Sequence, residues 1–350
     1  MTRTLTSAQD AAIREVRRKV VAMLDERQSG VPEGSAAEPS RYWTDFCSFF
    51  DYLIDLSPQS FAKLRLHTYH LTGDNYQTYY FGDRSAFLDY WSPWLSTEGL
   101  PAAHILSEPD DGIGFRLDDG RFVSQDIARF QRSVSTLSKA GLLAPRGRPA
   151  RVVEIGGGYG GLALSLSTIL GDSRYVIVDL PEVLLFSAAY LTLHAPEKSL
   201  FLYDPASPAR LAEADFVLLP DYRLDLLAGS DFDLAINLAS MQEMRPEQVE
   251  RYLDFLNATC SGVFYSCNRD HQKGNDELPG LFSLIRTRFA MTEAPGLSRP
   301  RGSIGTRVRV GLRAAMRRGA GALGLVEGTA RGTGDDPHPF VEHLCRRLPS

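Results

Sequence analysis

The sequence predicts a doubly wound α/β fold preceded by a mainly helical N-terminal region. Three observations support this prediction. In the C-terminal half, short apolar runs rich in β-branched residues alternate with helical patterns. A glycine-rich turn joins the first of these runs to a helix. In the N-terminal half, apolar residues recur mostly at three- and four-residue steps. We therefore expect a helical domain over residues 1–145 and an α/β domain over residues 146–350.

The predicted helices of the N-terminal half follow from the spacing of apolar residues. Val16 and Val20 illustrate this spacing within a charged segment. The middle of this half is dense in aromatic residues at similar steps, and a Gly/Pro/Ser-rich stretch separates it from the first helix. The predicted segments are a helix over 1–30, a linker over 29–35, a helical block over 42–100 and a helix over 122–143.

The C-terminal half is predicted to form a parallel sheet covered on both faces, because its strands are continuous apolar runs. Pro181 and Pro246 stand where two of the helices begin, and proline is favoured in a first turn. The last 60 residues are rich in Gly, Arg and Ala, and we expect them to hold the last strands and an insertion near 295–335. The predicted strands are 151–155, 175–179, 216–219, 232–237 and 262–267.

Composition narrows the classes of function. The chain has 350 residues, of which 43% are hydrophobic and 23% charged, with a formal net charge of −5. No apolar run approaches the ~20 residues of a membrane span, and the first 24 residues lack the apolar stretch of a secretory signal. We expect a cytoplasmic protein without a membrane or nucleic-acid partner. Four scattered cysteines predict neither a disulfide framework nor a zinc knuckle.

The glycine-rich turn carries the strongest chemical signal. Gly156, Gly158 and Gly160 form a G-x-G-x-G pattern in which the backbone can approach a ligand closely. Glu154 precedes the turn and suits a cationic or hydrogen-donating ligand better than a pyrophosphate. Asp179 ends the next strand, where a carboxylate can accept hydrogen bonds from both ribose hydroxyls. This combination favours S-adenosylmethionine, which carries an ammonium and a sulfonium group. The alternative is a tight turn that binds no ligand.

A resemblance to a known family supports this prediction. The stretch from Val152 to about Asp270 resembles S-adenosylmethionine-dependent methyltransferases of the Rossmann type, and more narrowly the sugar O-methyltransferase family. The resemblance implies that the cofactor lies at the carboxyl ends of the strands, and nothing is matched over about 295–335. The segments that carry it are 153–161, 176–182 and 233–244, with 75–82 and 124–126 less closely similar.

The resemblance also implies which residues hold the cofactor. The residues of the glycine-rich turn would bind the methionine part of the cofactor. The end of the second strand would bind the ribose, and the turn after the third strand would lie near the adenine. The end of the fourth strand would face the cleft. The residues so assigned are Glu154, Gly156, Gly158, Gly160, Asp179, Leu180, Asp221 and Asn237.

Transfer of a methyl group to an alcohol needs alignment and a group that removes the hydroxyl proton. The candidates are Glu243, Asp270 and His271, which follow the fourth and fifth predicted strands. His271 is the preferred base, with an ordinary loop histidine as the alternative. Glu243 is either a base in the cleft or a negative charge placed before the helix at Pro246. Because no ligand spacing for a metal is evident, we expect no metal.

Two further features concern the acceptor. Tyr76, Tyr79 and Tyr80 could stack on a sugar ring, although aromatic residues at helical spacing more often belong to a core. Together with Gln242 they are the predicted acceptor-binding residues. The segment 299–318 holds seven arginines and no acidic residue, and it is either a solvated face or a site for a diphosphate-bearing acceptor.

These features predict an S-adenosylmethionine-dependent O-methyltransferase that acts on a small molecule, a sugar or a sugar-bearing natural product. One alternative is a carboxylate- or C-methyltransferase of specialised metabolism. Another is a catalytically silent scaffold that binds the cofactor. A nicotinamide oxidoreductase is disfavoured by the glycine spacing. The expected partner is the small-molecule acceptor, and a homo-oligomer stays open.

Overall fold

The structure is a computed structural model that describes residues 4–32, 35–48, 51–61, 63–207, 211–294 and 339–348. The predicted insertion near 295–335, with its arginines, and His338 lie outside the described residues.

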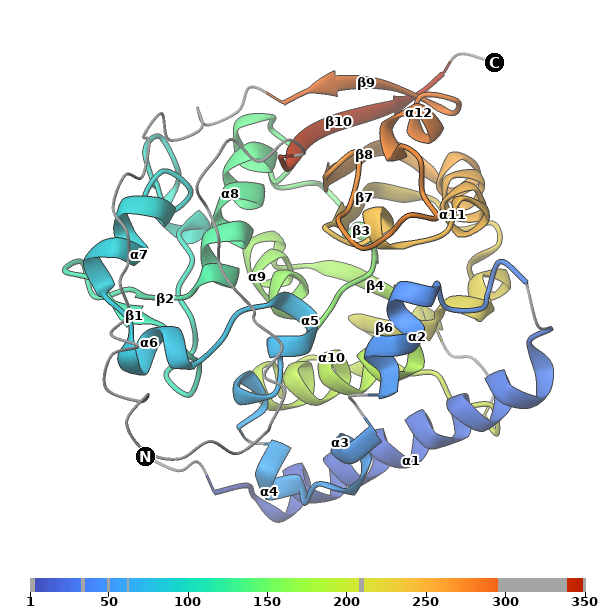
Figure 1. The fold of residues 1–350 in the computed structure, drawn as a ribbon, viewed down its shortest axis with the longest axis horizontal. Helices are drawn as coiled ribbons and strands as arrows, with labels where there is room; N and C mark the ends of the chain where they lie inside the picture. Colours follow the sequence, from blue (N-terminus) through green and yellow to red (C-terminus); the bar gives the residue numbers. More distant parts are fainter. Residues whose placement is uncertain are drawn as a thin grey trace, which may run out of the picture.

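The described residues of the C-terminal half form one eight-stranded mixed sheet (Figure 1). The strand order is β5-β6-β4-β3-β7-β8-β10-β9, in which the first six strands are parallel and β10 is antiparallel to both of its neighbours. The strands are β3 (Ala150–Ile155), β4 (Ser173–Asp179), β5 (Leu200–Leu202), β6 (Phe216–Pro220), β7 (Phe232–Leu238), β8 (Cys260–Asn268), β9 (Phe289–Glu293) and β10 (Val341–Arg347).

The five predicted strands are confirmed, and the fold is the predicted α/β fold with a helical N-terminal region. The predicted parallel sheet continues at one edge into an antiparallel part, whose strand directions the sequence left open. There β10 enters between β8 and β9 and pairs with both in the antiparallel sense. The short edge strand β5 was not predicted, because a three-residue apolar run is too brief to stand out from a loop.

Helices cover both faces of the sheet. In Figure 1, α8, α9 and α10 lie on one side of the strands and α11 and α12 on the other. Pro181 and Pro246 occupy the first turns of α10 and α11, as predicted. The helices are α8 (Gln125–Lys139), α9 (Gly161–Leu170), α10 (Pro181–His194), α11 (Pro246–Thr259) and α12 (Leu281–Ile285).

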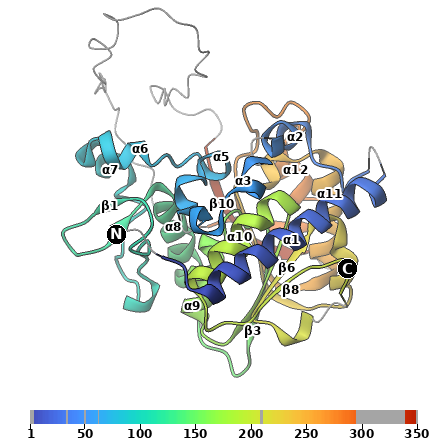
Figure 2. The ribbon, with the colours of Figure 1, turned by 90° about the horizontal axis from the view of Figure 1, so that it is seen from below.

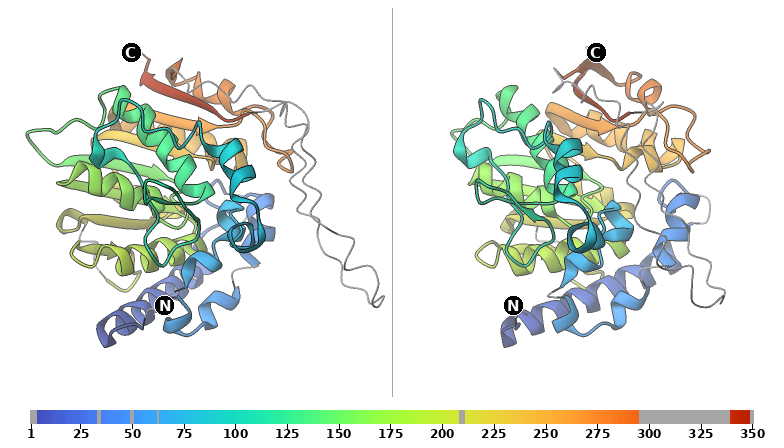
Figure 3. Two further views of the ribbon diagram at one scale, coloured as in Figure 1. Left: turned by 90° about the vertical axis from the view of Figure 1, so that its left-hand side faces the viewer. Right: turned by 60° about the vertical axis from the view of Figure 1, so that its left-hand side comes forward.

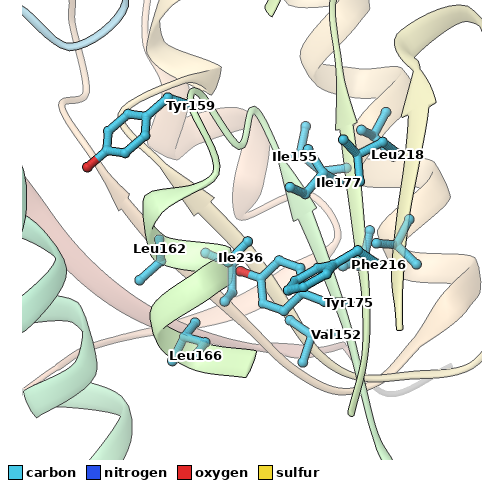
Figure 4. Close-up of a cluster of buried hydrophobic side chains, with 14 of the residues drawn as sticks. Val152, Ile155, Tyr159, Leu162, Leu166, Tyr175, Ile177, Phe216, Leu218 and Ile236 are labelled. Carbon is cyan, nitrogen blue, oxygen red and sulfur yellow. The ribbon is translucent and has the colours of Figure 1, made fainter. Parts of the chain in front are cut away.

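The core lies between the sheet and these helices. Figure 4 shows Tyr175 and Phe216 from neighbouring strands packed beside Val152, with Leu162 and Leu166 of α9 facing them. All five side chains are buried. Packing of these side chains fixes α9 against β3, β4 and β6. This packing sets the position of the turn between β3 and α9.

The first helix, α1 (Ser7–Gly30), confirms the predicted N-terminal helix and lies along α10 (Figures 1 and 2). Thr6 and Gln9 close its start with a capping box. Its apolar face is buried, and Arg27 pairs with Glu182 in the first turn of α10. Because this pair is largely removed from water, it holds α1 in register along the α/β half.

The aromatic block is broken into short helices rather than long ones. Several of these helices end at residues that favour helix termination. Gly73, for example, is the C-cap of α5 and has a φ of +70°. Figure 3 shows these helices, coloured blue to cyan, gathered on one side of the α/β half. The helices are α2 (Arg41–Cys47), α3 (Asp51–Asp55), α4 (Pro58–Phe61), α5 (Tyr69–Thr72), α6 (Gln77–Phe81) and α7 (Arg84–Trp91).

The helix predicted over 122–143 is shorter than expected. Phe122 and Val123 form β2, which pairs with β1 (Phe115–Arg116) as a small antiparallel hairpin. The α8 helix then begins after Ser124, whose hydroxyl accepts a hydrogen bond from the backbone N–H of Ile127 at 3.0 Å. In the described part of the chain, no helix combines the length and the apolar character that crossing a membrane requires.

Candidate functional site

A cavity of about 350 Å³ lies at the carboxyl ends of β3, β4, β6 and β7. Open α/β sheets bind their ligands at this edge, and the volume suits a small molecule. The N-terminal region closes the cavity with residues from α2, α5 and the start of α8. From the predicted site, the lining includes Glu154, Gly156, Gly158, Asp179, Leu180, Asp221, Gln242 and Glu243.

The glycine-rich turn needs its glycines for different reasons. Gly156 has a φ of +75°, and a Cβ atom there would lie 2.0 Å from the hydroxyl oxygen of Ser240, which follows β7. Gly158 has a φ of +55° and open space where a Cβ atom would stand. Gly160 is the N-cap of α9, with a φ of +85°, and does not line the cavity. The backbone at Gly158 is therefore the part of the turn that lies bare toward a ligand.

Three carboxylates follow one another along this edge. Glu154 is buried at the end of β3 and accepts a hydrogen bond from the hydroxyl of Tyr175 at 2.8 Å. Asp179 ends β4 and accepts from the backbone N–H groups of Gly158, at 3.1 Å, and Leu180, at 2.8 Å. Asp221 follows β6, is buried, and its Oδ1 atom has no hydrogen-bond partner among the described residues.

Removal from water raises the pKa of each of these groups. The pKa of Glu154 rises to about 8, although the hydrogen bond from Tyr175 opposes the rise. The pKa of Asp179 rises to about 7 against the effect of the Leu180 and Gly158 N–H groups. That of Asp221 also rises to about 7, opposed by the charge of Arg27. Buried carboxylates that lack a full counter-charge attract cations and hydrogen-bond donors.

Glu243 borders the same cavity as the glycine-rich turn, from a short 3-10 turn (Met241–Glu243) that follows β7. Burial raises its pKa to about 8, while a hydrogen bond from the Trp43 side chain lowers it. The chain enters this turn through Ala239, whose φ of 59° is unusual for a residue with a side chain. Ala239 itself lines the cavity, and backbone outliers of this kind often mark a functional site.

Gln242 lies beside Glu243 and organises the wall at the end of β8. Its side-chain oxygen accepts from the backbone N–H of Arg269 at 2.7 Å. Its amide nitrogen donates to the side-chain oxygen of Gln272 at 2.9 Å. Gln242 is buried, and its interactions place Arg269 and Gln272, which both line the cavity.

Asn237 does not face the cleft, contrary to the prediction. It is fully buried, and its side chain donates to the carbonyl of Ile155 at 2.7 Å. Its side-chain oxygen accepts from Met241 N–H at 3.1 Å and from the Asn268 amide at 2.8 Å. These contacts join β3, β7 and β8 at the base of the cavity, so Asn237 supports the site from beneath.

Asp270 and His271 also lie outside the cavity lining. One oxygen of Asp270 accepts from the backbone N–H of Phe282 at 2.7 Å, at the start of α12. Its other oxygen is 3.6 Å from Nε2 of His271, and both side chains are about 40% exposed. The structure thus places this pair in a partly exposed loop that does not line the cavity, whereas Glu243 lines it.

The three predicted tyrosines do not line the cavity. The hydroxyl of Tyr79 donates to Asp74 at 2.6 Å and accepts from the N–H of Gln125 at 2.8 Å, and its ring packs on Phe115. Tyr76 and Tyr80 lie on the surface, with exposed fractions of 36% and 72%. Tyr79 therefore follows the core alternative considered for these aromatic residues.

Sequence patterns missed several cavity residues that lie far from the glycine-rich turn in the chain. Trp43 comes from α2, and Asp126 and Arg129 from α8. Arg129 donates to the carbonyl of Thr72 at 2.7 Å and contacts Asp126 at 3.4 Å. The resemblance around 124–126 was the one signal near these positions. Among the described residues, no three His, Cys, Asp or Glu side chains gather in a metal-binding group.

No family model matches the sequence. No curated protein matches it either. The solved structures similar to it include a TehB-like SAM-dependent methyltransferase from Corynebacterium glutamicum, at 12% identity and a TM-score of 0.34, covering 63% of this chain and 96% of that one.

Two further structures are similar at the same level. A precorrin-6y C5,15-methyltransferase from Geobacter metallireducens is 16% identical with a TM-score of 0.32, covering 57% of this chain and 85% of that one. The structure of a fibrillarin/Nop5p complex is 10% identical with a TM-score of 0.37, covering 67% and 88%. We draw no function from likeness at this level.

Proposed function

We propose that the chain is an S-adenosylmethionine-dependent methyltransferase. The observation that carries the proposal is the row of carboxylates Glu154, Asp179 and Asp221 beside the bare backbone of Gly158, all bordering one cavity. A pyrophosphate would be repelled here, whereas a ligand with an ammonium, a sulfonium, ribose hydroxyls and an amino group would find acceptors at each.

The residues present fit this cofactor. The backbone of Gly156, Gly157 and Gly158 borders the cavity, and without side chains it can approach the methionine part of the cofactor closely. Asp179 retains acceptor capacity for ribose hydroxyls, since a carboxylate offers about four lone-pair sites and the hydrogen bonds from backbone N–H groups do not use all of them. The unpaired Oδ1 atom of Asp221 suits an exocyclic amino group. When bound, the cofactor supplies a methyl group activated on a sulfonium.

We further propose that the acceptor is a hydroxyl of a small molecule and that Glu243 receives its proton. Glu243 is the acidic side chain that borders the cavity after β7, next to the strand that carries the glycine-rich turn. Its raised pKa matches a base that works near neutral pH. Trp43 and the short N-terminal helices cover this region and exclude water from it.

Binding of S-adenosylhomocysteine, measured by calorimetry, tests the cofactor assignment. Gly158→Ala places a methyl group in the space next to the cavity, and we expect it to weaken binding at least about tenfold. Gly171→Ala is the matched control, because Gly171 also has a positive φ and open space but lies at the far end of α9. Equal losses in the two variants, or tighter binding of NAD than of S-adenosylhomocysteine, would contradict the proposal.

Formation of S-adenosylhomocysteine from S-adenosylmethionine over a panel of hydroxylated acceptors tests the reaction. Turnover with a hydroxyl acceptor supports O-methyl transfer. Binding of the cofactor without turnover on hydroxyl, carboxylate or carbon acceptors would instead favour a cofactor-binding scaffold.

A further inference from the structure

The stretch of chain that leads into α2 is bound to the residues that follow Glu243. The guanidinium of Arg245 donates to the backbone carbonyls of Ser35, at 2.7 Å, and Glu38, at 3.0 Å. The side-chain amide of Gln248 donates to the same Glu38 carbonyl at 2.9 Å. This stretch therefore lies against the start of α11, and its position fixes where α2 begins relative to the turn after β7.

Ser40 joins α2 to the backbone of Glu243. Ser40 is buried, and its hydroxyl donates to the carbonyl of Glu243 at 2.7 Å. The same oxygen accepts from the backbone N–H of Trp43 at 3.3 Å, as the side chain of an N-cap residue does. One side chain thus contacts both the 3-10 turn that carries Glu243 and the first turn of the helix that carries Trp43.

Trp43 contacts the side chain of Glu243. The indole donates a hydrogen bond to the Glu243 carboxylate, and both side chains line the cavity. The donor is Nε1–H, because an indole has no other. The ring of Trp43 packs against Tyr42, with 6.1 Å between ring centroids, and against Phe46, with 5.9 Å. The donor is therefore held in place by its neighbours in α2.

The charges that face Glu243 come from several elements. The charge of Asp179 raises the pKa of Glu243, and that of Arg129 lowers it. From α2, Tyr42 faces Glu243, and burial together with the Glu243 charge raises the pKa of this phenol. A substitution at Trp43 leaves these groups in place, so a change in the titration of Glu243 reports the lost hydrogen bond. The other ionisable side chains that line the cavity are Asp126, Glu154, Tyr159, Asp221, Tyr252 and Arg269.

We propose that Trp43 is a positioning residue that directs the Glu243 carboxylate at the acceptor hydroxyl, and that Ser40 holds the two residues together. The inference rests on the proposed function, since that function makes Glu243 the group that receives the proton. A single indole donor engages one oxygen of the carboxylate and leaves the other to receive the proton. The N-terminal region then takes part in the reaction and does not only cover the cavity.

NMR of the indole N–H groups tests the contact without turnover. The chain has three tryptophans, and Trp43→Phe identifies the signal of Trp43. If that variant does not fold, Trp91→Phe and Trp94→Phe identify the signal by elimination. We expect the Trp43 signal of the natural protein to shift with pH around a midpoint near 8, as Glu243 ionises, and to stay in place in Glu243→Gln. A Trp43 signal that does not shift through this pH range would overturn the inference.

Rates with an acceptor found in the panel test the role in the reaction. Trp43→Phe keeps an aromatic ring but lacks the donor, so the pKa of Glu243 should rise. The midpoint of the kcat/KM profile should move to a pH about one unit higher. At pH 7 we expect kcat to fall at least about tenfold, with little change in the KM of the acceptor. Ser40→Ala should lower kcat by a smaller factor.

Trp94→Phe is the matched control, because Trp94 is also half-buried but does not line the cavity. Its profile should match that of the natural protein. An unchanged midpoint in Trp43→Phe, or an equal shift in Trp94→Phe, would contradict the inference. Failure of the natural protein to bind S-adenosylhomocysteine would instead refute the proposed function. The NMR titration needs neither cofactor nor acceptor and still decides whether Trp43 holds Glu243, so the two failures are distinguishable.

Discussion

At Glu243 a single carboxylate experiences opposing influences. Burial raises its pKa, the hydrogen bond from Trp43 lowers it, and the charges of Asp179 and Arg129 raise and lower it further. The result, a pKa of about 8, leaves most of the side chain protonated at pH 7. As a base, Glu243 would act through its minor ionised form, which grows as the pH rises.

We predict that kcat/KM rises with pH by about tenfold per unit below pH 8 and levels off above it. Glu243→Gln should lower the rate by about 10²–10⁴ and remove this rise, because the amide cannot take up a proton. Measured pH–rate profiles of both proteins check this. Asp270→Asn serves as a comparison, and a profile that flattened in that variant instead would transfer the role of base to the surface pair.

The sequence predicted Glu243 as a candidate but favoured His271 as the base. Both follow strands of the same sheet, and both are chemically capable of accepting a proton. The difference lies in where the chain turns after each strand. The chain bends at Ala239 and brings Glu243 to the cavity wall, whereas the loop after β8 carries His271 to the surface.

At the scale of elements, the N-terminal helices and the glycine-rich turn meet at Arg65. This buried guanidinium lies 2.8 Å from Glu108, 3.0 Å from Asp126 and 3.4 Å from Asp74. It also lies over the ring of Tyr159, at 4.3 Å from the centroid, within the glycine-rich segment. One side chain thus links the short helices, α8 and the turn before α9.

We predict that Arg65→Met destabilises the protein by about 3–5 kcal/mol, because three buried carboxylates would lose their shared cation. Urea unfolding measures this change. Arg84→Met is the control, since the Arg84–Asp118 pair is exposed and should cost at most about 1 kcal/mol. Similar losses in the two variants would show that the buried cluster contributes no more than a surface pair.

Elements were predictable where local signals are strong. The five parallel strands and the first turns at Pro181 and Pro246 follow from apolar runs and from proline geometry. The β1–β2 hairpin and the place of β10 were not predictable. Both depend on pairing between segments, and the apolar content of a short strand does not say which neighbour it will meet.

For the whole molecule, the buried carboxylates of the cavity link stability to pH. Glu154 has a folded pKa of about 8, above its ordinary value of 4.5. The folded state therefore holds a proton that the unfolded chain releases between these values. The contribution to stability is complete below about pH 4.5 and is lost as the pH rises toward 8.

We predict that Glu154→Gln becomes more stable relative to the natural protein as the pH rises from 5.5 to 8. The amide mimics the protonated side chain and carries no charge to bury, and Tyr175 can still donate to its oxygen. The difference in the free energy of unfolding between the variant and the natural protein should change by at least about 1 kcal/mol, or about 2 °C in Tm, across this range. Thermal unfolding without cofactor, at several pH values, provides the measurement.

Comparing Glu154→Gln with the natural protein cancels the contributions to stability of the other groups that titrate over this pH range. The half-buried His67 and the buried His343 have lowered pKa values and add stability as the pH rises, in both proteins alike. A constant difference between the two proteins at all pH values would contradict the role given to Glu154.

The sequence by itself determined the α/β class, the glycine-rich turn and the acidic residues at the ends of β3 and β4 and directly after β6. These follow from local rules, because apolar runs form strands and a parallel sheet brings the carboxyl ends of its strands to one edge. Residues at those ends, such as Glu154, Asp179 and Asp221, are therefore brought together by topology alone.

Which other residues line the cavity was decided only by the tertiary structure. Trp43, Asp126 and Arg269 come from segments separated by up to about 230 positions, and no local pattern relates them. Their meeting depends on how the N-terminal helices dock and on the pairing of β8 with β10, which bury side chains from distant parts of the chain against one another. The acidic residues at the strand ends are thus placed by local sequence, and the cavity residues from distant segments are placed by long-range packing.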